Sequence, residues 1–293
     1  MSAVEAETAY PVSLQRRVDA YLEGLRFAAD PGTEGLEEAM RYSLLAGGKR
    51  IRPVLALATA EALGRDTEEV LPLAGALEMI HTYSLIHDDL PAMDDDDLRR
   101  GRPTCHVAYG EDVAILAGDG LFAEALRLVL TDQMGERDSV LEATRELVAA
   151  AGVRGMVGGQ YLDVAGGDDV EIRRLHELKT GALIAASVGC VLSLEGVNGP
   201  ATIPYRRFAA ELGVVFQIVD DILDVTGDEA ELGKPRGSDE RHGKATYVSV
   251  YGLDLARELA RESHAAARAA LADADGRTER LGQIADYVLT RPA

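Results

Sequence analysis

The sequence predicts an all-α protein, and three observations favour this fold class. Apolar residues recur at helical spacing along almost the whole 293-residue chain. Leu, Ala, Val and Ile must build the core because the chain has only four Phe and no Trp, and this composition favours helices over packed sheets. No alternating run of polar and apolar residues is long enough for a strand. We therefore expect one helical domain over residues 1–293.

Each expected helix is justified by its apolar period and by the residues that interrupt it. The segments are 12–28, 34–46, 53–63, 67–89, 111–133, 138–158, 170–196, 202–224, 252–272 and 277–291. The interruptions are Asp30-Pro31-Gly32, Gly47-Gly48, Pro91, Gly101-Arg102-Pro103, Gly166-Gly167, Asn198-Gly199-Pro200 and Gly233-Lys234-Pro235. Because these breaks are short, we expect a bundle of neighbouring antiparallel helices.

The charge and the cysteines exclude several classes of protein. A net charge of −20 without a basic stripe argues against binding to nucleic acid. The two cysteines, Cys105 and Cys190, are far apart and indicate no disulfide framework, which fits a cytoplasmic protein. The first residues do not resemble a signal peptide. The apolar stretch 182–194 is short for a membrane span, so we expect a core helix and no membrane insertion.

An acidic cluster follows the apolar segment 71–87. It comprises Asp88, Asp89 and the run Asp94–Asp97. The first two aspartates stand at the C-terminal end of a helix, where the helix dipole favours cations rather than anions. Converging carboxylates repel one another, so a bound cation would stabilise them. The alternative is a solvated acidic loop.

A second acidic cluster lies inside an apolar helix. Asp220 and Asp224 are four residues apart and share a helix face, and Gln217 lies one turn before them on that same face. Polar groups in such a core-like helix need partners. One site of this kind is commonly a paired core carboxylate, but two acidic sites on apolar helices indicate a shared function.

Carboxylate oxygens favour a hard cation, and we expect Mg²⁺ shared with substrate phosphates. A calcium EF-hand is excluded because Leu90 occupies the position of its second ligand. Zinc is not expected because no His or Cys lies at ligand spacing.

Basic residues are sparse but occur in motifs that suit a phosphate ligand. The segment Gly47–Pro53 carries three cations at a glycine-led helix start, where backbone N–H groups also favour anions. Arg99 and Arg100 follow the first acidic cluster, and arginine binds phosphate in a bidentate manner. Further candidates are Lys179 and Thr180 on an apolar helix, Lys234 and Lys244 in a Gly-rich segment, and His81, two turns before Asp88.

Together these motifs resemble the polyprenyl synthetase family of trans-prenyltransferases, the farnesyl and geranylgeranyl diphosphate synthases of bacteria in particular. The similarity spans almost the whole chain. It rests on Gly47-Gly48-Lys49-Arg50-Ile51-Arg52-Pro53, His81, Asp88–Gly101, Lys179-Thr180-Gly181, Asp220–Asp224 and Gly243-Lys244-Ala245-Thr246-Tyr247. One departure is Ala245, where relatives often carry Ser.

The resemblance implies an all-α fold of ten or more helices around a central cavity, the isoprenoid synthase fold, and a homodimer. It implies the Mg²⁺-dependent joining of isopentenyl diphosphate to an allylic diphosphate, with about three Mg²⁺ ions in each site.

It also assigns roles to residues. The metal ligands would be Asp88, Asp94, Asp220, Asp221 and Asp224. Asp88, Asp89, Asp94, Asp220, Asp221 and Lys179 would form the catalytic group. The allylic diphosphate would contact Arg99, Lys179, Thr180, Gln217, Lys234 and Lys244. The diphosphate of isopentenyl diphosphate would contact Lys49, Arg52, His81 and Arg100.

Product length depends on the residues just before Asp88, because the growing chain of similar enzymes runs down from that point. One helical turn, about 5.4 Å, is on the order of one isoprene unit. Ser84 is small, and Tyr83 is bulky as in similar enzymes with short products, so we expect farnesyl diphosphate (C15), with geranylgeranyl diphosphate (C20) as the alternative. Helical phase alone would instead turn Tyr83 away from the cavity.

Three other functions are compatible with parts of the pattern. A terpene cyclase or head-to-head synthase would not need the second diphosphate site of Lys49, Arg52 and His81. A non-catalytic partner subunit would not need two intact acidic clusters. An acidic structural protein would leave the basic motifs unexplained.

Overall fold

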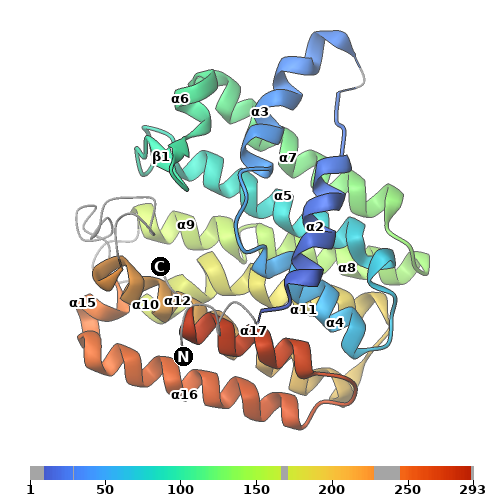
Figure 1. Ribbon diagram of the computed structural model, residues 1–293, viewed down its shortest axis with the longest axis vertical. Helices are drawn as coiled ribbons and strands as arrows, with labels where there is room; N and C mark the ends of the chain where they lie inside the picture. The colour runs from blue at the N-terminus through green and yellow to red at the C-terminus, as the bar shows by residue number, and fades with distance from the viewer. Residues whose placement is uncertain (1–9, 29, 166–170, 228–244, 292–293) are drawn as a thin grey trace.

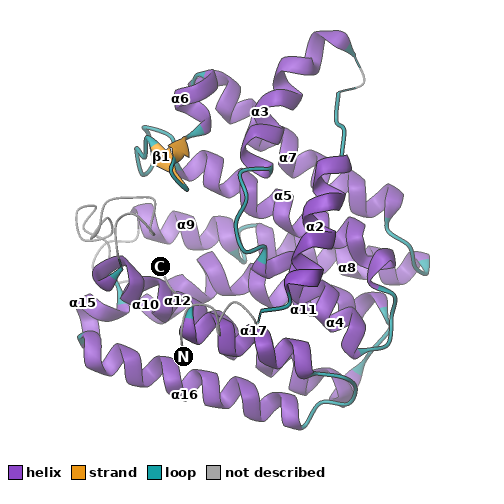
Figure 2. Ribbon diagram, viewed as in Figure 1, coloured by secondary structure: helices purple, strands orange, loops and turns teal. Residues whose placement is uncertain are grey.

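The computed structural model describes residues 10–28, 30–165, 171–227 and 245–291, and it is almost entirely helical (Figures 1 and 2). This confirms the predicted all-α class. The elements of the first half are α2 (Val12–Gly24), η1 (Pro31–Thr33), α3 (Glu34–Leu44), α4 (Ile51–Ala62), η2 (Thr67–Val70), α5 (Leu71–Asp88), β1 (Leu98–Arg99), β2 (Arg102–Pro103), α6 (Cys105–Tyr109) and α7 (Glu111–Asp132).

The second half of the chain is also helical. Its elements are α8 (Arg137–Ala151), α9 (Met156–Ala165), α10 (Ile172–His176), η4 (Glu177–Gly181), α11 (Ala182–Leu194), η5 (Gly199–Thr202), α12 (Ile203–Thr226), α15 (Tyr247–Tyr251), α16 (Leu253–Ala272) and α17 (Glu279–Thr290).

Three helices, α4, α5 and α11, form the centre of the core. Their residues are buried on nearly all sides, as expected for helices that are apolar all round. α5 packs against α4 and α7, and α11 packs against α4, α8 and α12. The last residue of the central helix α5 is Asp88, so the core itself positions the first acidic cluster.

The segment Ile172–Leu194 runs as one continuous helix of 23 residues through α10, η4 and α11. The apolar stretch 182–194 is the C-terminal part of this helix, which lies within the expected helical segment 170–196, and the helix's length and composition would suit a membrane span. However, 61% of its most apolar window is buried inside the protein. That burial fits the expected core helix.

Two local differences from the expected elements have simple causes. The expected helix 138–158 is two helices, because the chain turns at Gly152 and Gly155 between α8 and α9. A short antiparallel hairpin, β1–β2, follows the first acidic cluster. Arg100 and Gly101, in the turn of this hairpin, have positive φ. The strands are too short to give an alternating pattern, so the tight turn is the only sign of the hairpin in the sequence.

Candidate active site

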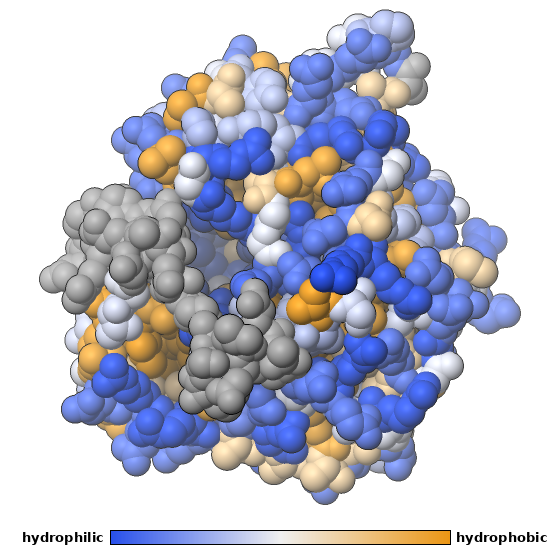
Figure 3. All heavy atoms as spheres, viewed as in Figure 1, coloured by the Kyte–Doolittle hydropathy of each residue, from blue (hydrophilic) through white to orange (hydrophobic). Residues whose placement is uncertain are grey.

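One cavity of about 680 Å³ brings most of the predicted site residues together. Its walls come from α5, the β1–β2 hairpin, α9, η4 and α12, and Figure 3 shows a hollow with hydrophilic residues at its edge. The predicted residues in its lining are Arg52, His81, Tyr83, Ser84, Asp88, Asp94, Arg99, Arg100, Lys179, Thr180, Gln217, Asp220 and Asp221. Lys49, Asp89 and Asp224 do not line it, and Lys234 and Lys244 lie outside the described residues.

The first acidic cluster folds back on the end of α5. The backbone N–H of Asp94 donates to the carbonyl of Asp88 at 2.9 Å, and that of Asp95 donates to Leu90 at 3.2 Å. Asp95 adopts a left-handed conformation with φ 54°, which aspartate tolerates better than most residues. This turn brings Asp88 and Asp94 into the lining of one cavity.

Asp89 points away from the cavity into the protein, where it holds Arg99. The Asp89 side chain is only 4% exposed, and its Oδ1 lies 2.7 Å from Nε and 2.5 Å from Nη2 of Arg99. Burial raises the pKa of Asp89, and the guanidinium of Arg99 opposes that rise. A buried carboxylate of this kind fixes its partner, so Asp89 orients the Arg99 guanidinium at the cavity wall.

The second acidic cluster is part of a chain of hydrogen bonds across two helices. Thr180 Oγ1 donates to Gln217 Oε1 at 2.9 Å, and Gln217 Nε2 donates to Asp221 Oδ1 at 2.7 Å. The other oxygen of Asp221 accepts the backbone N–H of Tyr247 at 2.7 Å. Asp220, one residue earlier, is exposed and lines the cavity. The structure thus gives neighbouring aspartates different surroundings.

Lys179 lies on η4, a π-helical turn inserted in a long helix. Such turns are rare and occur frequently at functional sites. A Cβ on Gly159 would lie only 2.2 Å from the backbone nitrogen of Lys179, so glycine lets α9 pack directly on this turn. Asp163, one turn further along α9, pairs with Lys179 Nζ at 2.5 Å. The close packing therefore fixes the ammonium group at the wall.

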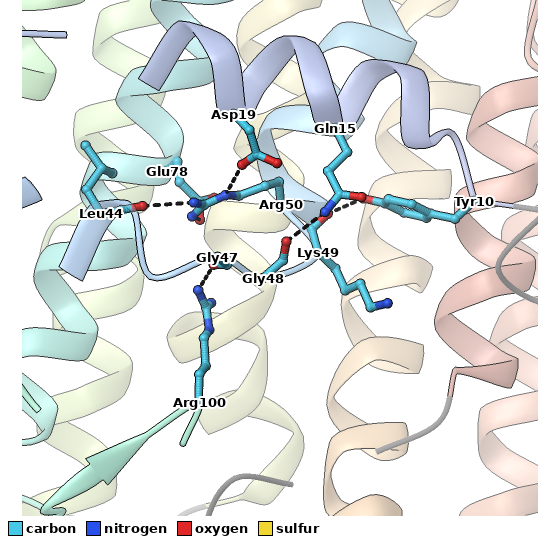
Figure 4. A network of polar contacts seen from close by, with 10 residues as sticks. All are labelled: Tyr10, Gln15, Asp19, Leu44, Gly47, Gly48, Lys49, Arg50, Glu78 and Arg100. Atoms are coloured by element: carbon cyan, nitrogen blue, oxygen red, sulfur yellow. Dashed lines mark hydrogen bonds and ion pairs between the residues drawn. The ribbon is translucent and has the colours of Figure 1, made fainter. Parts of the chain in front are cut away.

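The glycine-led loop before α4 is held from several directions (Figure 4). Arg50 adopts a left-handed conformation and pairs with Asp19 at 2.9 Å and with the buried Glu78 at 2.7 Å. Gln15 Nε2 donates to the carbonyl of Gly48 at 2.9 Å, and Arg100 donates to the carbonyl of Gly47. Arg50 is thus an internal support, and it is not part of the cavity wall.

Gly48 is required by the close approach of Arg100. It has φ +115°, and a Cβ there would lie 2.6 Å from the Arg100 guanidinium carbon. The Arg100 side chain therefore crosses directly over the loop. Lys49 does not line the cavity, and its Nζ lies 5.6 Å from the centroid of the Tyr287 ring.

The basic part of the cavity contains a neutral imidazole among guanidinium groups. Burial and the nearby Arg52 and Arg100 lower the pKa of His81 well below its usual range. Burial also lowers the pKa of Arg52 to about 10, and its Nε finds no hydrogen-bond partner within the described part of the chain. His81 is therefore suited to donate a hydrogen bond rather than to supply a charge.

Tyr83 lines the cavity, although helical phase alone would turn it away from Asp88. Its ring is nearly buried and makes edge contacts with His87 and with Phe122 of α7. Ser84 also lines the cavity, where its hydroxyl donates to the carbonyl of His81 at 2.9 Å.

Sequence reasoning missed several polar residues of this site. Gln160 and His176 line the cavity and carry buried polar atoms that find no partner in the described residues. Arg291, just after α17, pairs with Asp220 at 3.1 Å and stacks on Phe216 at 4.2 Å. The Gly158-Gly159 pair before Gln160 could have indicated from the sequence that α9 packs closely on a neighbour. No sequence pattern links Arg291 to Asp220.

The donor set fits Mg²⁺ shared with a ligand better than a closed metal cage. Four aspartates line one cavity from two sides: Asp88 at the end of α5 with Asp94 in the turn after it, and Asp220 with Asp221 on α12. No group of three or more His, Cys, Asp or Glu side chains is gathered tightly enough to hold a metal by itself, within the described ranges. Mg²⁺ commonly takes one or two carboxylates and completes its shell with phosphate oxygens and water.

Comparisons with known proteins agree with this geometry. The model of the family "Polyprenyl synthetase" matches residues 33–286. The chain is 44% identical to farnesyl diphosphate synthase of Geobacillus stearothermophilus over 95% of this chain and 94% of that protein. It is 46% identical to a chloroplastic geranylgeranyl pyrophosphate synthase of Capsicum annuum over 87% of this chain and 71% of that protein.

A solved structure is also similar. The geranyltransferase of Helicobacter pylori, complexed with magnesium and isoprenyl diphosphate, superposes with a TM-score of 0.84 at 32% identity, covering 95% of this chain and 94% of that one. A family model matched over most of the sequence, close relatives over nearly full length and a shared fold agree with the motifs in the cavity: the chain belongs to the polyprenyl synthetase family.

Proposed function

We propose that this protein is a prenyltransferase that condenses isopentenyl diphosphate head to tail with dimethylallyl and geranyl diphosphates, giving farnesyl diphosphate. One observation carries the proposal: two acidic clusters and a set of Arg, Lys and His side chains line the same cavity. Carboxylates alone would repel a diphosphate, and cations alone would not need the aspartates. Farnesyl diphosphate synthases are among the relatives, and the family supports the predicted enzyme class.

About three Mg²⁺ ions in each site would be held from two sides of the cavity. Asp88 and Asp94, at and just after the end of α5, would bind from one side. Asp220, Asp221 and Asp224 of α12 would bind from the other. When bound, Mg²⁺ would neutralise the diphosphates and act as a Lewis acid on the leaving group. A similar structure contains magnesium together with isoprenyl diphosphate.

The chain's own groups would bind and orient two diphosphates. Arg99, fixed by Asp89, and Lys179, fixed by Asp163, would contact the allylic diphosphate. Gln217 and Thr180 extend that wall. Arg52, Arg100 and the neutral His81 offer donors to the second diphosphate. From the family pattern only, Lys49 is proposed to contact the second diphosphate, and Lys234 and Lys244 are proposed to contact the allylic diphosphate.

The apolar part of the cavity wall would hold the hydrocarbon chain and exclude water from the allylic cation. Tyr83, Ile115, Met156 and Val157 contribute largely apolar side chains to the lining. Tyr83 supports a C15 product. A C20 product is the second candidate, because geranylgeranyl synthases are also among the relatives.

Assembly is proposed to be a homodimer in the cytoplasm, without membrane insertion. Large apolar side chains are exposed along α7, α8 and α9, and α8 packs against both of its neighbours. They are Leu116, Leu130, Leu141, Val148, Val153, Val157, Tyr161 and Val164. Several exposed apolar residues on helices that pack side by side would suit an interface. Sedimentation of the wild type and of Tyr161→Glu would test this, with a monomer expected for the variant.

A product assay tests the proposed function. The purified protein would receive Mg²⁺, isopentenyl diphosphate and, separately, dimethylallyl, geranyl or farnesyl diphosphate, and the products would be dephosphorylated and sized. We expect a C15 product from the two shorter starters and no elongation of farnesyl diphosphate. A C20 product would support the second candidate. No product from any starter would contradict the enzyme assignment, and turnover without isopentenyl diphosphate would indicate a cyclase.

A further inference from the structure

Tyr83 makes two aromatic contacts, one with Phe122 of α7 and one with His87 of its own helix, α5. Its ring centroid lies 5.3 Å from that of Phe122 at an interplanar angle of 77°, and 5.8 Å from that of His87 at 78°. Both are edge-to-face arrangements, the geometry that aromatic rings favour. Tyr83 and His87 line the cavity, whereas Phe122 does not. Phe122 therefore stands behind Tyr83.

His87 is itself fixed to the backbone of α7. Its Nε2 donates to the carbonyl of Ile115 at 3.1 Å. A Cβ on Gly118 would lie 2.2 Å from that nitrogen, so the imidazole occupies the space that a side chain at position 118 would need. Glycine at this position therefore allows α5 and α7 to approach closely, and the approach sets the position of Phe122 relative to Tyr83.

This arrangement explains how Tyr83 reaches the cavity although it is out of phase with Asp88. The residue faces α7, and its ring is kept at the wall by the contacts on either side of it. A tyrosine on a helix ordinarily has alternative χ1 rotamers. Without the ring of Phe122 behind it, Tyr83 would gain room to turn out of the wall and would leave a longer cavity.

We propose that Phe122, together with the His87–Gly118 contact, positions Tyr83 and thereby sets the length at which the hydrocarbon chain stops. Phe122 is a positioning residue, since it touches Tyr83 rather than the cavity. This inference rests on the proposed prenyltransferase activity and extends it to a second layer of residues on α7.

The test compares product lengths of four proteins: wild type, Phe122→Ala, Tyr83→Ala and the double variant. Mg²⁺, isopentenyl diphosphate and geranyl diphosphate would be supplied to each. Phe122→Ala should raise the ratio of C20 to C15 product by roughly tenfold, the equivalent of about 1.4 kcal/mol. Tyr83→Ala should raise it at least as much. The double variant should match Tyr83→Ala, because Phe122 acts only through Tyr83.

Two matched controls separate this effect from a general loss of packing. Leu126→Ala alters a half-buried residue one turn further along α7 that does not line the cavity, and it should leave the product ratio unchanged. Phe122→Tyr keeps an aromatic ring and should keep the wild-type ratio. Thermal unfolding of every variant would show whether the fold is retained.

The outcomes distinguish the two levels of inference. No product from the wild type would overturn the proposed function. A product ratio that changes for Tyr83→Ala but not for Phe122→Ala would overturn the positioning role alone. If Phe122→Ala still lengthened the product in the Tyr83→Ala background, Phe122 would act directly on the cavity rather than through Tyr83, which also contradicts the inference.

Discussion

Asp88 and Asp94 reach the cavity through backbone turns at the end of α5, whereas the basic loop Gly47–Arg52 is held by side chains from α2, α5 and the β1–β2 hairpin. Asp88, Asp94 and Asp220 are more exposed than Arg50 and Arg52, which are buried, as Asp221 is. The basic loop is thus held by internal partners, whereas these three carboxylates are accessible to a ligand in the cavity. Substitutions should therefore affect turnover in the acidic part and affinity or stability in the basic part.

The largest effect is expected for Asp88→Ala or Asp220→Ala. Each should lower kcat by roughly a thousandfold, because the charge that holds metal at the leaving group is lost. Circular dichroism should show an unchanged helical fold, since neither carboxylate is deeply buried. Near-normal kcat in either variant would contradict the metal assignment. Glu124→Ala on the outside of α7 is a suitable control.

Asp89→Asn provides a sharper contrast within the same cluster. Asp89 holds Arg99 rather than lining the cavity, so the variant should weaken the orientation of that guanidinium and raise KM for the allylic diphosphate, roughly tenfold. Its kcat should fall far less than that of Asp88→Ala. A loss of turnover equal to that of Asp88→Ala would show that Asp89 acts directly on metal or substrate.

In the basic loop, Arg50 and Arg52 should behave differently although they are two residues apart. Arg50→Met leaves Glu78 buried without its partner and should destabilise the fold by about 3–5 kcal/mol, measured by denaturant unfolding. Adding Glu78→Leu should recover much of that loss. Arg52→Met should instead raise KM for isopentenyl diphosphate with a smaller effect on unfolding. If Arg50→Met and Arg52→Met destabilised the fold equally, the assignment of Arg50 to stability and of Arg52 to substrate binding would be contradicted.

Much of this division could be predicted from the sequence, because charged residues in apolar helices need partners and therefore mark a site. The placement of Asp88 at the end of a buried helix and of Asp220 on another followed from the helical period. The sequence did not reveal that Asp89 and Asp163 hold cations, since their partners, Arg99 and Lys179, are brought to them by a hairpin and by a π-helical turn. These contacts depend on glycine packing and tight turns, which carry no periodic signal.

His176 shows that the acidic part of the cavity also depends on burial. Burial lowers the pKa of His176 to about 4, although Asp163 favours its charged form. A depressed pKa in the folded state gives stability that is complete above the unfolded value of about 6.5 and is lost as the pH falls toward 4. The loss should approach about 3 kcal/mol at pH 4.

The measurement is urea unfolding of the wild type and of His176→Gln at several pH values between 7 and 4. His176→Gln should remove most of this residue's contribution to the pH dependence, while other groups keep theirs. The same slope in both proteins would mean that His176 gains its proton without cost in the folded state. The ring would then be held by a neighbouring carboxylate, and the acidic part of the cavity would stabilise cations of the protein as well as a metal ion.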